Sequence, residues 1–259
     1  MGGDFLIILA IAVTAALASP LGGALSLIIK PTTLVLSLAV GLAAGLLLGT
    51  FAFEMMPEAL GMAALPFIVV SFMIGFGLVY GLDLFVNRGQ IAGAEADQHG
   101  KVERFHKRRK PRGDVVTVIA GATSAEELIE GLVIGVGAAI DTNIALIVGL
   151  AIFIDNISEA MSLGTIARED GGQHVGRRVM AWTGTIGLSL LVSAMAGWFL
   201  LRDLPDEVLG SLLALGAGAM FYLTVSDLLP EAESHQYQQS AALATAVGFL
   251  TTMVLSNLK

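Results

Sequence analysis

The chain has 259 residues, of which 55% are hydrophobic and only 14% are charged. Soluble domains carry about 25% charged residues, and a mean hydropathy of +0.80 excludes a disordered chain. The absence of cysteine excludes disulfides and thiolate metal sites, and the net charge of −8 argues against a nucleic-acid partner. The composition therefore predicts an all-α polytopic membrane protein that has the lipid bilayer as its main partner.

Eight stretches are long and apolar enough to cross a bilayer, which takes a helix of about 20 mostly apolar residues. In chain order they cover residues 5–29, 33–56, 66–86, 115–140, 143–166, 179–201, 208–229 and 241–255. The first is the least regular, because Pro20 and the pair Gly22-Gly23 interrupt it. A cleaved signal peptide is the alternative for this stretch, but the basic start of such peptides is missing. We expect one transmembrane transporter domain over residues 1–259, with a long polar loop at 87–113.

The distribution of lysine and arginine predicts how the chain lies in the membrane. If the N-terminus is outside, the connections that face the cytoplasm hold 12 of the 14 basic residues. Cytoplasmic loops are enriched in these residues. We therefore expect both termini to lie outside. The expected location is the cell (inner) membrane of a prokaryote.

Two internal repeats relate spans of opposite direction. Glu-Met-Met-Pro-Glu-Ala at 54–59 matches Asp-Leu-Leu-Pro-Glu-Ala at 227–232, with an offset of 173. Glu-Glu-Leu-Ile-Glu at 126–130 matches Asp-Asn-Ile-Ser-Glu at 155–159, with an offset of 29. A pseudo-two-fold axis in the membrane plane relates such copies in many secondary transporters. Chance similarity between apolar sequences is the alternative, which the rarity of acidic residues inside membrane helices disfavours.

The second repeat puts acidic residues in the middle of two spans. The set consists of five carboxylates and one amide, namely Glu126, Glu127, Glu130, Asp155, Asn156 and Glu159. An aspartate at the centre of a membrane helix costs about 2.5–3.5 kcal/mol, and neither span contains a lysine, arginine or histidine. Residues three and four apart share a helix face, so each triad converges, and antiparallel neighbours would bring the triads together. An all-oxygen cluster of this kind suits a hard divalent cation. The alternative is a set of protonated carboxyls that bind helices together without an ion.

At these residues the chain resembles the ZIP (Zrt/Irt-like) family of divalent metal transporters. The fourth and fifth spans carry variants of the family's His-Asn-x-Pro-Glu-Gly and Gln-Asn-x-Pro-Glu patterns, and residues 227–232 are similar to its Glu-x-x-Pro-Glu-Ala. The resemblance covers nearly the whole chain. It implies a 3+2+3 arrangement of eight helices, an inverted repeat, and transport of Zn²⁺, Fe²⁺ or Mn²⁺ by alternating access.

The resemblance also implies roles for single residues. The primary metal site would consist of Glu126, Glu130, Asp155 and Glu159, with Glu127 and Asn156 in an adjoining site. Glu231 and His235 would lie toward the cytoplasmic exit. Glu54 and Asp227 are repeat mates near the ends of their spans, and either a gate on the pathway or a pair of interfacial acids explains them.

The chain departs from the family pattern at three points. Glu126 replaces the usual histidine, Ile129 and Ser158 replace prolines that kink the two helices, and the sixth span lacks a glutamate that many members carry. Because no imidazole or thiolate is left, selectivity should lean toward oxygen-preferring ions. Zinc also accepts carboxylates, and no organic cofactor is expected.

Two other functions compete with a metal carrier. A proton- or sodium-coupled calcium/cation exchanger is one, because Gly-Ala-Thr-Ser-Ala-Glu at 121–126 resembles the Gly-x-Ser-x-Pro-Glu repeat of those proteins, although the copy around Asp155 lacks the glycine and serine. An intramembrane metal hydrolase is the other, and it is disfavoured because no span carries a histidine-bearing catalytic motif. We therefore expect a transporter and not an enzyme. The sequence leaves open whether the chain is a monomer or a homodimer.

Overall fold

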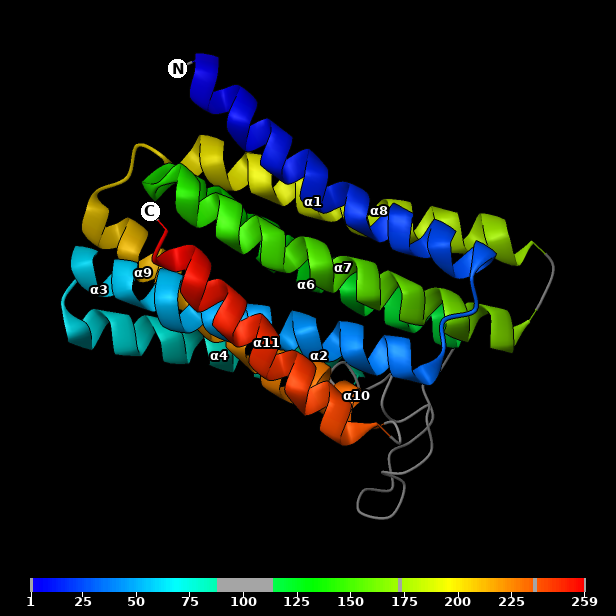
Figure 1. Cartoon of the computed structure of the whole chain (residues 1–259). Helices are drawn as coiled ribbons and strands as arrows, with labels where there is room; N and C mark the ends of the chain where they lie inside the picture. The colour runs from blue at the N-terminus through cyan, green and yellow to red at the C-terminus, as the bar shows by residue number, and fades with distance from the viewer. Residues whose placement is uncertain (1, 88–113, 172–173, 235–236, 259) are drawn as a thin grey trace.

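The computed structural model describes residues 2–87, 114–171, 174–234 and 237–258. Within these ranges every regular element is a helix, so the all-α prediction is confirmed. Seven helical stretches are long and apolar enough to cross a membrane, which marks an integral membrane protein. The long helices run alongside one another, and the two ends of the chain lie at the same end of the bundle (Figure 1).

The helices follow the predicted spans closely. In chain order, with η for a π-helical turn, they are α1 (Gly2–Ile28), α2 (Thr33–Thr50), η1 (Phe51–Met55), α3 (Met56–Met62), α4 (Leu65–Asn87), α6 (Val115–Ile140), α7 (Thr142–Asp170), α8 (Val175–Leu201), α9 (Asp206–Leu223), η2 (Thr224–Leu228), α10 (Leu229–Ser234) and α11 (Gln238–Ser256). Helix α6 has 26 residues but is not among the seven apolar stretches. The reason is its acidic content. Any stretch of 18 residues within α6 contains all three of its glutamates, so no such stretch has fewer than three charged side chains. The long predicted loop lies outside the described residues.

The expected interruption of the first span is wrong. Helix α1 continues through Pro20 to Ile28, and the pair Gly22-Gly23 serves helix packing. A Cβ atom added to Gly22 would lie 2.5 Å from the carbonyl oxygen of Ile157 in α7. One added to Gly23 would lie 2.7 Å from the side chain of Thr183 in α8. The pair therefore lets three helices approach closely, as small residues do in membrane proteins.

Two π-helical turns interrupt the second and the seventh spans. Each lies just before a proline, Pro57 or Pro230. Proline lacks the N–H that would bond the carbonyl four residues earlier, so the helix widens, and the N–H of Met56 bonds the carbonyl of Phe51. The freed carbonyl of Phe53 accepts a hydrogen bond of 3.0 Å from the hydroxyl of Ser256 in α11. Such turns are frequent at functional sites.

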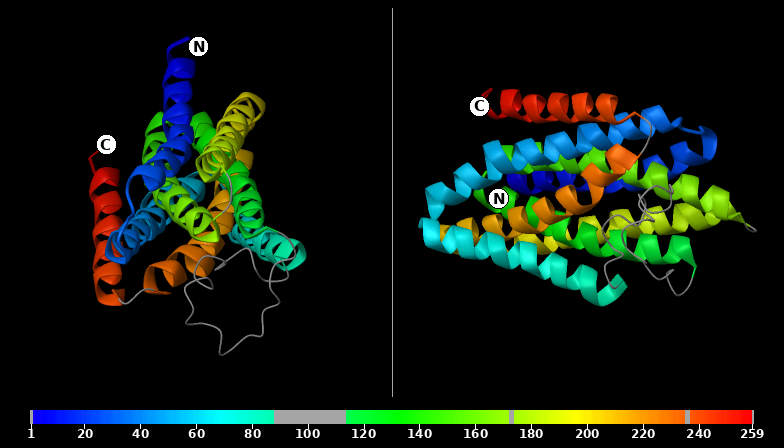
Figure 2. Two further views of the ribbon diagram at one scale, coloured as in Figure 1. Left: turned by 90° about the vertical axis from the view of Figure 1, so that its right-hand side faces the viewer. Right: turned by 90° about the horizontal axis from the view of Figure 1, so that it is seen from below.

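The first sequence repeat extends over whole structural units. The bounds of α9 and η2 equal those of α2 and η1 shifted by the offset of the first repeat, and the start of α10 is related to that of α3 in the same way. Packing follows the same correspondence: α6 packs on α8 and α9, while α7 packs on α1 and α2. Likewise α11 packs on α2, and α4 packs on α9. Seen along the bundle, α11 and α4 lie on opposite flanks (Figure 2).

A first group of helices, α1, α6, α7 and α8, is packed through backbone contacts. The contact of Gly22 in α1 with Ile157 in α7 is one of them. Gly135 in α6 makes another with α8, because a Cβ atom added to Gly135 would lie 2.6 Å from the carbonyl oxygen of Ala194. At one end, Arg178 in α8 pairs with Asp114, which caps α6, and with Asp170 at the end of α7. These contacts hold the four helices together as one unit.

A second group consists of α2, α4, α9 and α11 with their short extensions. An added Cβ on Gly41 in α2 would lie 2.6 Å from the carbonyl oxygen of Ala241 in α11, and Gly218 in α9 approaches the backbone of Phe72 in α4. Contacts of α3 with α9 and of α10 with α2 join the two pairs. The two groups meet where α7 packs on α2 and where α6 packs on α9. At the contact of α6 with α9, Gly216 approaches the side chain of Val133 and not backbone.

We predict that Gly45→Ala lowers the melting temperature of the purified protein. A Cβ at this position would collide with the Thr245 carbonyl oxygen in α11, and overpacking costs about 1–3 kcal/mol, which corresponds to about 3–10 °C. Gly77→Ala is the matched control, because nothing lies within 4 Å of its added Cβ. It should melt at the same temperature or higher. An equal decrease of the melting temperature in the two variants would contradict the close packing of α2 on α11.

Candidate functional site

A small cavity lies where the two groups of helices meet. It has a volume of about 20 Å³, enough for a water molecule or a metal ion. Helices α6, α7, α2 and the α9–η2 unit line it with Leu47, Glu126, Glu127, Glu130, Asp155, Glu159, Met220, Leu223, Thr224, Asp227 and Leu228. Six of these residues are acidic and none is basic. The charge of the cavity is therefore strongly negative whenever these groups are ionised.

The structure brings together most of the residues that the sequence singles out. Five of the six predicted metal ligands line the cavity, and the sixth, Asn156, is buried without lining it. Asp227 also lines the cavity, whereas its repeat mate Glu54 is buried in η1 outside the lining. Glu231 is buried and accepts a hydrogen bond from α7. His235 lies outside the described residues.

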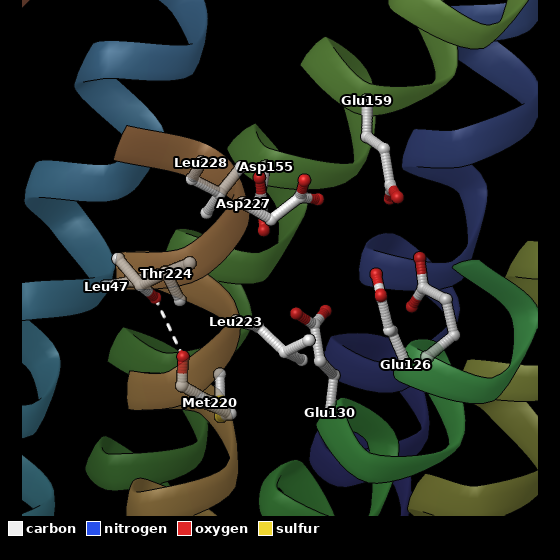
Figure 3. A pocket seen from close by; sticks show the side chains of 11 residues that line it. Leu47, Glu126, Glu130, Asp155, Glu159, Met220, Leu223, Thr224, Asp227 and Leu228 are labelled. Carbon is white, nitrogen blue, oxygen red and sulfur yellow. Dashed lines mark hydrogen bonds between the residues drawn. The ribbon is translucent and has the colours of Figure 1, made fainter. Parts of the chain in front are cut away.

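Three of the cavity's carboxylates are almost inaccessible to solvent. Glu127 is 1% exposed, and Glu130 and Asp155 are each 6% exposed. One oxygen of each has no hydrogen-bond partner among the described residues: Oε2 of Glu127, Oε2 of Glu130 and Oδ1 of Asp155. A buried charge without a partner is costly, so these oxygens call for a cation or a proton. In Figure 3, Glu126 and Glu159 point toward each other and Asp155 lies beside Asp227.

Hydroxyl groups on neighbouring helices donate hydrogen bonds to two of the acids. Thr123 Oγ1 in α6 donates a hydrogen bond of 2.6 Å to Glu159 Oε1 in α7. Ser162 Oγ donates one of 3.1 Å to Glu231 Oε1 in α10. Neither hydroxyl is among the residues predicted from the sequence, although the spacing contains a signal. Thr123 precedes Glu126 by three residues and Ser162 follows Glu159 by three, so each shares a helix face with the acids.

The carboxylates surround the cavity without meeting at one point. In the part of the chain that the structure describes, no three histidine, cysteine, aspartate or glutamate residues are grouped so that they could hold one metal ion as they stand. The acids come from α6, α7 and η2, and glutamate side chains have several rotamers within reach. A cation in the cavity would therefore draw side chains inward.

Comparison with known proteins adds an independent observation. No family model matches the chain. Among curated proteins it is similar to the zinc transporter ZupT of Escherichia coli O7:K1 (strain IAI39 / ExPEC), O127:H6 (strain E2348/69 / EPEC) and strain K12 / DH10B. Each is 26% identical over 207 residues, which are 79% of this chain and 77% of the relative. ZupT is a zinc transporter of the ZIP family, and the similarity confirms the resemblance of this chain to that family.

Proposed function

We propose that the chain transports a divalent metal ion of the zinc, iron and manganese class across the membrane through the acidic cavity. The observation that carries the proposal is the group of six carboxylates around one cavity without a basic residue. Intramembrane acids of this kind mark ion pathways. The name of the curated relatives, zinc transporter, supports zinc as the substrate, and carboxylate ligands are compatible with zinc, iron and manganese alike.

The ligands we assign to the ion are Glu126, Glu130, Asp155 and Glu159, with Glu127 and Asn156 adjoining them. The first four form two pairs of repeat mates, and all four line the cavity. The oxygens of Glu130 and Asp155 without a hydrogen-bond partner are available to a cation. A metal ion bound there must displace the protons of any protonated carboxyl, which provides a means of coupling transport to a proton gradient.

For the mechanism, we infer alternating access by movement of one helix group against the other. The inferred architecture is a 3+2+3 inverted repeat, in which α6 and α7 form the central pair. Backbone contacts at glycines join helices within each group, whereas the approach of α9 to α6 is through a side chain. The cavity lies at this interface, so movement there would expose it to each side in turn. With the termini outside, Glu231 and Ser162 would lie on the cytoplasmic side of the cavity.

The exchanger alternative predicts a different dependence on counter-ions. A calcium/cation exchanger would move Ca²⁺ against a sodium or proton gradient, whereas a carrier of the zinc class would move Zn²⁺, Fe²⁺ or Mn²⁺. Uptake of these radiolabelled ions into proteoliposomes, with and without each gradient, distinguishes the two. We expect Zn²⁺, Fe²⁺ or Mn²⁺ uptake that sodium does not drive. Sodium-driven Ca²⁺ uptake alone would contradict the proposal.

We expect Glu130→Gln and Glu159→Gln each to reduce the initial rate of Zn²⁺ uptake at least tenfold. Each substitution removes one charged ligand, and a loss of about 1.4 kcal/mol in binding free energy corresponds to a factor of ten. Glu207→Gln is the control, because this exposed residue at the start of α9 is remote from the cavity lining. Normal uptake by both cavity variants, at equal protein content of the liposomes, would eliminate the assigned site.

We expect Thr123→Val to raise the KM for Zn²⁺ about tenfold with little change in protein yield. The variant loses the hydrogen bond that orients Glu159, and a hydrogen bond to a charged group contributes about 1.5–3 kcal/mol. Thr123→Ser keeps a hydroxyl and should restore the KM. Thr185→Val is the control, since this exposed hydroxyl bonds only its own helix backbone, at Ala181. An unchanged KM in Thr123→Val would show that Thr123 does not position Glu159.

A disulfide across the interface should stop transport. The Cβ atom of Val133 and an ideal Cβ on Gly216 are 3.6 Å apart, within the range of disulfides, and the chain has no cysteine of its own. Oxidation of Val133→Cys/Gly216→Cys should abolish Zn²⁺ uptake, and reduction should restore it. Ala63→Cys/Gly210→Cys is the control, with the same 3.6 Å separation inside one group. Transport by the oxidised interface variant would contradict the proposed movement.

A further inference from the structure

The cavity divides into a symmetric centre and an asymmetric extension. In the centre, both members of three pairs of repeat mates line it: Glu126 with Asp155, Glu130 with Glu159, and Leu47 with Met220. Glu127 also lines the centre, although its mate Asn156 does not. In the extension the lining comes from one repeat only. Leu223, Thr224, Asp227 and Leu228 line it, but their mates in the first copy of the repeat do not.

The corresponding residues of the first repeat copy are packed against other side chains and do not line the cavity. Thr50, Phe51, Glu54 and Met55 are between 0% and 4% exposed, and the ring of Phe51 packs edge-on against Phe221 at 6.0 Å between centroids. Leu223, Thr224 and Leu228 are themselves at most 8% exposed, so in exposure the two copies differ chiefly at the acids: Asp227 is partly exposed, whereas Glu54 is 2% exposed. The repeats therefore have the same backbone, including the π-helical turn, in two different environments.

The two π-helical turns lie toward opposite ends of the bundle. Each precedes a short helix at the end of its span, α3 after η1 and α10 after η2, and these short helices lie toward opposite ends of the bundle (Figure 1). The cavity thus extends from its centre toward the η2 side and is closed toward the η1 side. In an inverted-repeat carrier, the opposite state exchanges the environments of the two repeats.

We propose that Asp227 and Glu54 bind the transported ion in turn, each completing the site in the state that is open to its own side of the membrane. The proposal rests on the proposed function. In the present state Asp227 lies beside Asp155 (Figure 3), which is only 6% exposed and has an oxygen without a hydrogen-bond partner among the described residues. Two adjacent carboxylates repel unless a cation or a proton lies between them. In the opposite state, Glu54 takes the place of Asp227 at the cavity.

The test measures Zn²⁺ transport in membrane vesicles of the two orientations, so that the ion is presented to either side. Asp227→Asn should raise the KM about tenfold for Zn²⁺ presented from the η2 side and less than twofold from the η1 side. Glu54→Gln should show the reverse. The controls are Glu233→Gln in α10 and Glu58→Gln in α3, acidic neighbours that do not line the cavity, and they should leave both values unchanged.

A second measurement does not depend on transport. In the cysteine-free chain, Thr224→Cys and Phe51→Cys are each exposed to a membrane-impermeant maleimide from one side at a time. Thr224→Cys should react only from the η2 side and Phe51→Cys only from the η1 side, and Zn²⁺ should slow both reactions. This sidedness together with the side-specific KM changes supports the proposal.

The outcomes separate this proposal from the proposed function. Reaction of both cysteines from the same side, no reaction of Phe51→Cys from either side, or equal KM changes on both sides would overturn the alternation of Asp227 and Glu54, whatever the unsubstituted protein transports. Absence of Zn²⁺, Fe²⁺ and Mn²⁺ uptake by the unsubstituted protein would overturn the proposed function, and with it ion binding by these two residues.

Discussion

Negative charge confined in the middle of an apolar bundle is the constraint on which the rest of this structure depends. Six acidic side chains line one cavity that has no basic residue, and an ionised aspartate at the centre of a membrane helix costs about 2.5–3.5 kcal/mol. Hydroxyls such as that of Thr123 offset part of the cost. Oxygens of Glu127, Glu130 and Asp155 remain without hydrogen-bond partners among the described residues. Either protons or a bound cation would neutralise these groups, and in the proposed transport a divalent ion replaces the protons.

The repeats arrange the remaining structure around that charge. Helices α6 and α7 bring the two acidic motifs to the same cavity. Glycine contacts hold α6 to α8 and α7 to α1. Pro57 and Pro230 widen the second and seventh spans into π-helical turns, each with an acid inside. The two copies differ in environment, since the Asp227 turn faces the cavity and the Glu54 turn is packed shut. Similar backbones in unlike surroundings are what an inverted-repeat carrier requires in either of its two end states.

Much of this could be predicted from the sequence, because the bilayer reduces the fold to lengths of apolar helix. The spans, the offset of 173 between the repeats and the acids that line the cavity follow from periodicity and composition. The expected break at Pro20 does not, since packing of Gly22 on Ile157 keeps α1 continuous. The π-helical turns and the two helix groups also had no signal in apolar patterning, because they depend on which backbones touch. The role of Thr123 depends on the position of Glu159 in the neighbouring helix, which spacing along one helix does not predict.

The most direct test of the central claim is a crystallographic map of anomalous scattering at the zinc absorption edge, from the purified protein with Zn²⁺. We predict a peak inside the cavity, with carboxylate oxygens of Glu130 and Glu159 at about 2.0–2.2 Å from the ion. Carboxylates bonded to one another in a cavity without any anomalous peak, while zinc occupies other positions in the same crystal, would contradict the account.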